Sequence, residues 1–150
     1  MAEFVATLRS ANTHADLVAL IAKPAVASLL RGVFENSPYL THLVTADPGR
    51  LLWLLETPPE KAFADLKAKL SQQMIEAREL PAAKSALRAS KNAVALLTAL
   101  ADLSGVWPVM TVTRVLSETA DAAVALSVRY LFARAHEAGR WASPDPAEPE

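Results

Sequence analysis

The stretch "LRASKNAVALLTALADLSGVWPVMTVTRVLSETADAAVALSVRYL", residues 87–131, decides the fold of this chain of 150 residues. Its first part repeats apolar side chains every three, four or seven positions, which is the spacing of one face of a helix. Gly105 can adopt the left-handed conformation that ends a helix. The stretch therefore predicts two long helices, at about 81–104 and 108–138. Because the connection between them is short, we expect them to pack as an antiparallel hairpin.

The second helix of this hairpin has a wide apolar face, which predicts a central place in the fold. The positions in register on that side are Val109, Val112, Val115, Leu116, Ala120, Ala122, Ala123, Leu126, Ser127, Tyr130 and Arg134. Folding the hairpin about Val106 sets Lys91 near Asp121, with Arg88 one turn away along its own helix. We therefore expect an ion pair between Asp121 and either Lys91 or Arg88.

Helix-start signals with proline recur upstream of the hairpin. Ser37 and Asp47 each place a side-chain acceptor directly before a proline, which predicts short helices at about 38–45 and 48–56. The stretch "TPPE", residues 57–60, has the pattern of a capping box. There the threonine would cap the next helix and the glutamate would reach back to it.

An amphipathic helix follows this third signal. Its apolar stripe steps by three or four residues and comprises Phe63, Leu66, Leu70, Met74 and Ala77. Nearer the start of the chain, Pro24 interrupts a leucine- and valine-rich segment, and proline cannot donate the backbone hydrogen bond of a continuous helix. We expect a break or kink there.

These signals predict an all-α fold, because helix starts recur and strand signals do not. We expect one helical bundle domain at residues 1–140. The last ten residues, "WASPDPAEPE", hold three prolines and three carboxylates. Such a segment buries too little apolar surface to offset its ordering entropy, so we expect a flexible linker at 141–150.

Composition narrows the class of protein. The net charge is −1, which favours neither nucleic acid nor a membrane as partner, and no uncharged apolar run approaches the roughly 18 residues of a membrane helix. The span 61–91 holds seven basic and three acidic residues, a net charge of +4, and we interpret it as a solvated helix face. The absence of cysteine fits a reducing compartment, and we expect the cytoplasm.

The patterns of catalytic, metal and nucleotide sites do not occur in this sequence. His14, His42 and His136 lie far apart and have no second ligand at helical spacing, so we expect ordinary surface or boundary histidines. The four glycines never cluster into a phosphate-binding loop. A small-ligand site would need a sizeable pocket with convergent polar groups, and the dense alanine content argues against one.

Two residues near the hairpin connection have a structural and a functional interpretation each. Asp102 lies in the last turn of its helix, where the dipole disfavours an anion by up to about 1 kcal/mol. We favour hydrogen bonds from the amides that open the next helix, with an exposed acid offered to another domain or protein as the alternative. Trp107 is more often a core side chain than part of a contact patch at such a position.

The hairpin resembles the helical region that precedes the first catalytic domain of glutamine synthetase adenylyltransferases. The similarity rests on Leu87 with Arg88, Lys91, "ALADLSG" at 99–105, Val112 with Thr113, and "LSETAD" at 116–121. Upstream, "NSPYLTHLVTADPGRLLWLL" is similar to an earlier segment of that family. The resemblance covers about 34–140, and the hairpin is its more specific part. It marks as signature or interface candidates Arg88, Lys91, Asp102, Gly105, Thr113 and Asp121.

The resemblance implies a place in a regulatory enzyme. Members of that family add and remove AMP on a tyrosine of glutamine synthetase, use ATP with Mg²⁺ or Mn²⁺, and respond to a PII-type signal protein. Their nucleotidyltransferase centre lies beyond the region that this chain resembles, and no residue here matches its catalytic positions. We therefore expect a non-catalytic helical fragment, inactive alone, that packs on the nucleotidyltransferase domain and helps partner recognition.

A free-standing helical interaction module is the alternative. Its basic 61–91 face or an alanine-rich groove would bind a helix of another protein. The encoding DNA beyond Glu150 would separate the two hypotheses. A glycine-serine loop with an aspartate pair would favour the fragment, and a stop codon would favour the module.

Overall fold

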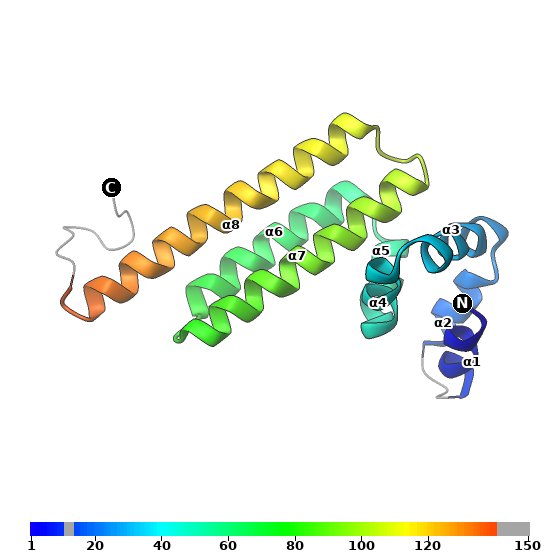
Figure 1. Cartoon of the computed structure of the whole chain (residues 1–150), viewed down its shortest axis with the longest axis horizontal. Coiled ribbons are helices and arrows are strands. Elements are labelled where there is room, and N and C mark those ends of the chain that lie inside the picture. The colour runs from blue at the N-terminus through cyan, green and yellow to red at the C-terminus, as the bar shows by residue number, and fades with distance from the viewer. Residues whose placement is uncertain (11–13, 141–150) are drawn as a thin grey trace.

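The computed structural model describes residues 1–10 and 14–140, and these ranges contain eight α-helices and no strand (Figure 1). The predicted all-α fold is confirmed. The helices are α1 (Ala2–Ser10), α2 (Ala15–Ile21), α3 (Pro24–Asn36), α4 (Pro38–Ala46), α5 (Pro48–Glu56), α6 (Pro59–Glu76), α7 (Leu80–Leu103) and α8 (Val109–Glu137). The linker expected at 141–150 lies outside the described residues.

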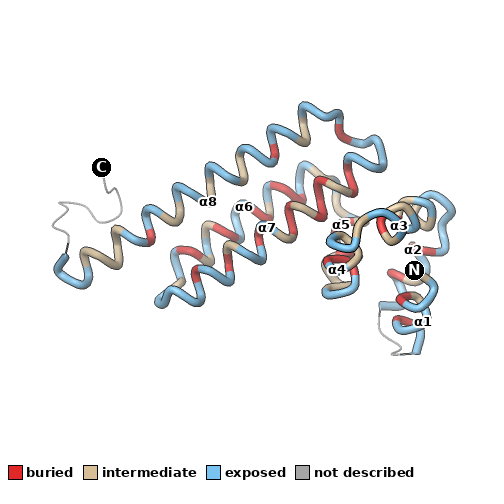
Figure 2. Tube along the Cα trace, viewed as in Figure 1, coloured by how far each residue is buried: buried red, intermediate tan, exposed pale blue. Residues whose placement is uncertain are grey.

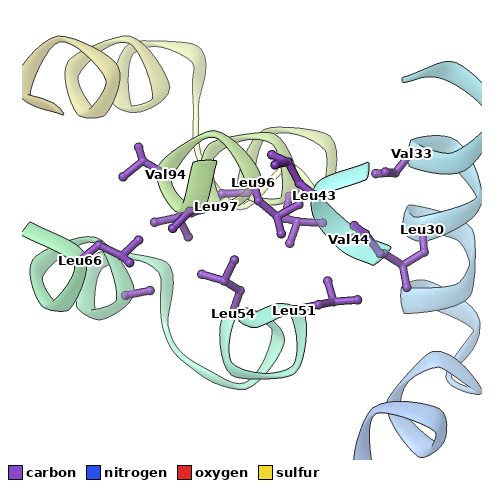
Figure 3. Packing of buried hydrophobic residues seen from close by; sticks show 14 of the residues in the cluster. Leu30, Val33, Leu43, Val44, Leu51, Leu54, Leu66, Val94, Leu96 and Leu97 are labelled. Atoms are coloured by element: carbon purple, nitrogen blue, oxygen red, sulfur yellow. The ribbon is translucent and has the colours of Figure 1, made fainter. Parts of the chain in front are cut away.

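The three long helices α6, α7 and α8 lie side by side, and the five short helices gather at one end of them (Figure 1). One hydrophobic cluster joins both parts, because it runs from Phe4 in α1 to Val115 in α8. Figure 3 shows leucine and valine side chains from α3 to α7 meeting in this cluster. A smaller cluster at the far end of the long helices comprises Leu70, Met74, Ala83, Ala86 and Tyr130.

The predicted hairpin is present as α7 and α8, and its helix bounds lie within one residue of the expected ones. Gly105 has φ 71°, and its amide donates to the Asp102 carbonyl at 2.9 Å. The Val106 amide donates to the Ala101 carbonyl at 3.0 Å. These two bonds form a Schellman motif, which satisfies carbonyls at the end of α7.

Two of the three predicted cap signals act as expected. The Ser37 hydroxyl accepts a hydrogen bond from the Leu40 amide at 3.2 Å, and the Asp47 carboxylate accepts one from the Arg50 amide at 2.9 Å. The prediction of a capping box at residues 57–60 is wrong. Helix α6 begins one residue later than expected, so its cap position is Pro58, which has no side-chain acceptor.

The break at Pro24 is confirmed. Helices α2 and α3 meet there at 92°. Among the described residues, neither these helices nor any other is alone long and apolar enough to cross a membrane. Together, α2 and α3 have the length and composition of one broken span.

The expected central position of α8 is wrong, since α7 occupies the centre. Helix α7 buries ten of its residues and contacts α4, α6 and α8, whereas α8 buries only Val115 and Tyr130. In Figure 2, α7 carries many buried residues while α8 is mostly exposed or intermediate. Because α6 and α7 already bury their apolar stripes against one another, α8 adds only a narrow strip to the bundle.

Candidate functional site

An uncharged stripe runs along the side of α8 that faces away from the bundle. Seven exposed residues, each three or four positions from the next, form it and are called here the α8 outer face: Met110, Thr113, Ser117, Ala120, Val124, Val128 and Leu131. Met110 is 74% exposed, Val124 64% and Leu131 57%. An exposed, uncharged and mostly apolar stripe of this kind is typical of a surface that another protein or domain covers.

Ion pairs lie on α8 beside this stripe and not within it. Glu118 accepts from Lys67 of α6 at 2.9 Å and from Arg114 at 2.6 Å. These two bonds, the one from Lys67 first, lower the pKa of the Glu118 carboxyl below its usual value. The Lys67–Glu118 pair connects α6 to α8, the Arg114–Glu118 pair lies within α8, and both leave the α8 outer face uncharged.

The candidates from the sequence fall on three different parts of the molecule. Thr113 lies within the α8 outer face, where its hydroxyl donates to the Val109 carbonyl at 2.9 Å. Asp121 is exposed next to that face. Asp102 and Gly105 lie at the hairpin connection, and Lys91 lies on α7 next to α4.

The expected ion pair of Asp121 with Lys91 or Arg88 is wrong. The salt bridges of the described residues include none of these three side chains. Lys91 instead donates to the Tyr39 hydroxyl at 2.9 Å and lies 4.8 Å from the centre of that ring. The Lys91 side chain therefore lies on the side of α7 that faces α4.

The favoured role of Asp102 is also wrong. Helix α8 has Pro108 at its cap position and no side-chain cap, so the Asp102 carboxylate does not bind the amides that open α8. This carboxylate is exposed and has no hydrogen bond or ion pair within the described ranges. The alternative, an exposed acid available to another domain, fits its position.

Trp107 is a core side chain, as expected. It is 4% exposed, and its indole Nε1 donates to the Glu60 carboxylate at 2.8 Å. This bond, helped by the Glu60 backbone amide, lowers the pKa of Glu60 below its usual value although partial desolvation opposes it. Glu60 therefore connects the start of α6 to the α7–α8 connection.

A cleft of about 740 Å³ lies between α5, α6 and α7. It is lined by Asp47, Arg50, Trp53, Asp65, Leu66, Lys69, Leu70, Gln73, Ala89, Ser90, Asn92 and Ala93. The expectation that alanine-rich packing leaves no pocket is wrong here. The α7 residues Ala89, Ser90 and Ala93 are too short to fill the space opposite Trp53.

Metal binding has no support within residues 1–10 and 14–140, where no three histidine or acidic side chains come together. His14 and His42 are exposed and His136 is partly buried, as expected for surface and boundary histidines. All seven basic residues of the 61–91 span are exposed, which confirms a solvated face.

Comparison with known proteins gives consistent results. Residues 27–150 match the family described as glutamate-ammonia ligase adenylyltransferase. Three relatives carry the name bifunctional glutamine synthetase adenylyltransferase/adenylyl-removing enzyme. The protein of Bradyrhizobium sp. (strain ORS 278) is 42% identical over 82% of this chain, that of Bradyrhizobium diazoefficiens 40% over 91%, and that of Xanthobacter autotrophicus 36% over 84%. The chain spans 12 to 14% of the length of these relatives, and no solved structure matches it.

Proposed function

The chain belongs to the glutamate-ammonia ligase adenylyltransferase family, and from this premise we propose that it acts as a non-catalytic helical region of a longer enzyme. That enzyme would add AMP to a glutamine synthetase tyrosine and remove it, in the cytoplasm. ATP with Mg²⁺ or Mn²⁺ would bind to its other regions, since the described residues contain no cluster that fits a metal. A PII-type signal protein would control the whole enzyme.

The α8 outer face carries this proposal. Exposed side chains such as Met110, Val124 and Leu131 contribute little to the stability of the chain by itself, and each would gain from burial against another domain. We assign this face to contact with the nucleotidyltransferase domain. Asp121, exposed and unpaired within the described part of the chain, would offer a charge next to this face, and Asp102, equally exposed and unpaired there, would offer one at the hairpin connection.

A direct test of the non-catalytic role uses the chain as it stands. Purified chain is mixed with adenylylated glutamine synthetase and phosphate. Transfer of the AMP group to phosphate would form ADP, and the amount of ADP is measured. We expect no turnover above the background without protein. Turnover that rises with the concentration of the chain would contradict the proposal.

A test of the docking role requires the remaining domains of an enzyme of this family. In the Bradyrhizobium diazoefficiens relative, which is 40% identical over 136 residues, the matched segment is replaced by this chain. The double substitution Val124→Asp with Leu131→Asp is then introduced, and adenylylation and AMP removal are measured. We expect activity in the chimera and loss of about tenfold or more in the variant, because two buried carboxylates would oppose docking.

Ile75→Asp is the matched control, since Ile75 is 76% exposed on α6 and lies outside the α8 outer face. It should leave the activity of the chimera unchanged. Equal activity of the chimera with and without the α8 substitutions would overturn the docking role and favour the free-standing module. Circular dichroism of the isolated variant chain verifies that the substitutions do not unfold it.

A further inference from the structure

We propose that the cleft between α5, α6 and α7 binds a small organic anion with an apolar or aromatic body. This inference is independent of the α8 outer face, which does not line the cleft. It rests on the volume of the cleft, on the apolar side chains that line it and on which of its charged side chains already have an ion-pair partner. The volume of about 740 Å³ falls within the range of small-molecule sites.

The charges of the lining favour an anion. Both carboxylates already have a cation: Asp47 accepts from the Arg50 guanidinium at 2.9 Å, and Asp65 accepts from Lys61 at 2.6 Å. Lys69 is the remaining formal charge of the lining, and its ammonium group has no partner within the described ranges. The charges of the four charged lining side chains sum to zero, and Lys69 is the one among them without a partner in the described ranges, so a bound carboxylate would pair with its ammonium group.

Further donors surround the cleft. Asn92 accepts from the Tyr39 hydroxyl through its Oδ1 at 3.3 Å, which leaves its amide N–H groups for a ligand. Gln73 adds a second side-chain amide from α6. The Nε of Arg50 is buried without a hydrogen-bond partner, which is an uncommon state that costs free energy. A small rotation of Arg50 toward a bound anion would satisfy it.

The rest of the lining suits an apolar body. Leu66 and Leu70 of α6 and Ala89 and Ala93 of α7 line the cleft, and Trp53 of α5 adds an aromatic side chain to the lining. Aromatic rings bind planar apolar groups well by stacking or edge contacts. An anion with a flat ring would therefore use both the donors and the apolar residues.

The test compares three probes of one shape by NMR titration of the ¹⁵N-labelled chain. These are 2-naphthoate, its neutral analogue 2-naphthamide and the cation 2-naphthylmethylamine. We expect saturable shifts of the Trp53 indole and of the Gln73 and Asn92 side-chain amides with naphthoate. Naphthamide should bind about tenfold more weakly, since it lacks the charge-assisted hydrogen bonds, and the amine should bind most weakly.

Substitutions localise the effect. Lys69→Gln should weaken naphthoate binding about tenfold and bring it level with naphthamide, whereas Lys84→Gln, on an exposed part of α7 outside the cleft, should change nothing. Ala89→Leu fills the cleft from an exposed helix position and should abolish binding of all three probes. No saturable shift with naphthoate, equal binding of the amine, or unchanged binding in either cleft variant would overturn the proposal.

Discussion

At the scale of single residues, Trp107 and Glu60 join parts of the chain that the sequence separates by 47 positions. The pKa of Glu60 is lowered in the folded state. The ionised Glu60 carboxylate therefore contributes to the free energy of unfolding at pH values above its unfolded-state pKa of 4.5. This contribution is lost as the pH falls through the lower folded-state pKa. Trp107→Phe removes the N–H donor and keeps a ring in the core. We expect the pKa of Glu60, measured by NMR titration of its carboxyl, to rise toward its ordinary value.

Trp53→Phe is the control for this prediction, because the indole of Trp53 does not bind Glu60. It should leave the Glu60 titration unchanged. Chemical unfolding at several pH values gives a second measurement. The stability gap between wild type and Trp107→Phe should narrow as the medium becomes more acidic, and a gap that is constant with pH would show that the hydrogen bond contributes nothing.

Two glycines provide a matched pair. Gly105 has φ 71°, where a Cβ is strained, whereas Gly32 lies within α3 and a Cβ there meets nothing within 4 Å. Gly105→Ala should lower the free energy of unfolding by about 1 kcal/mol or more, and Gly32→Ala should raise it by up to about 1 kcal/mol. Urea unfolding of both variants checks the signs. A stabilised Gly105→Ala would refute the role of this residue in ending α7.

Two of the three interactions expected between near neighbours in sequence were predicted correctly, the capping box at 57–60 being the exception, and those between distant residues could not be predicted. The caps at Ser37 and Asp47 act within three residues, so spacing along the chain is enough to place them. The partner of Lys91 lies 52 positions away in α4, and that of Glu60 lies 47 positions away. Which side of a helix meets which neighbour depends on packing, and one sequence does not state it.

At the scale of helices, the sequence predicted their positions well and their order of burial poorly. Both α7 and α8 repeat apolar residues at helical spacing, so periodicity alone cannot tell which of them the other helices surround. Helix α7 became central because α4, α6 and α8 all contact it. Most residues of the α8 outer face are apolar positions of α8 that remain without a neighbour.

The same substitution in the two helices measures this difference. Leu96 in α7 is 0% exposed, and Leu131 in α8 is 57% exposed. Leu96→Ala should lower the free energy of unfolding by about 2 to 5 kcal/mol, because it removes buried methyl groups and leaves a cavity. Leu131→Ala should change it by less than about 0.5 kcal/mol. Thermal and urea unfolding verify both values, and equal losses would contradict the peripheral position of α8.

At the scale of the whole molecule, the candidate surfaces arise from arrangement. The cleft needs α5, α6 and α7 together, and the α8 outer face exists because α8 lies at the edge of the bundle. The sequence contained one signal for the cleft, the short side chains Ala89, Ser90 and Ala93 on one side of α7. Small residues such as these allow close packing when another helix approaches and leave a cleft when none does. The sequence alone therefore does not show which of the two they form.

Stability should be uneven along this elongated molecule. The large cluster holds the short helices and the connection end of the hairpin, whereas the other end of α8 is held by the small cluster through Tyr130. We expect the amides of residues 126–137 to exchange hydrogen by local opening, faster than those of residues 94–100 in α7.

Tyr130→Ala should accelerate exchange at 126–137 about tenfold or more and leave 94–100 nearly unchanged. Val128→Ala, at a neighbouring exposed position, is the control and should alter neither region. Equal acceleration in both regions would show that the bundle opens as one cooperative unit.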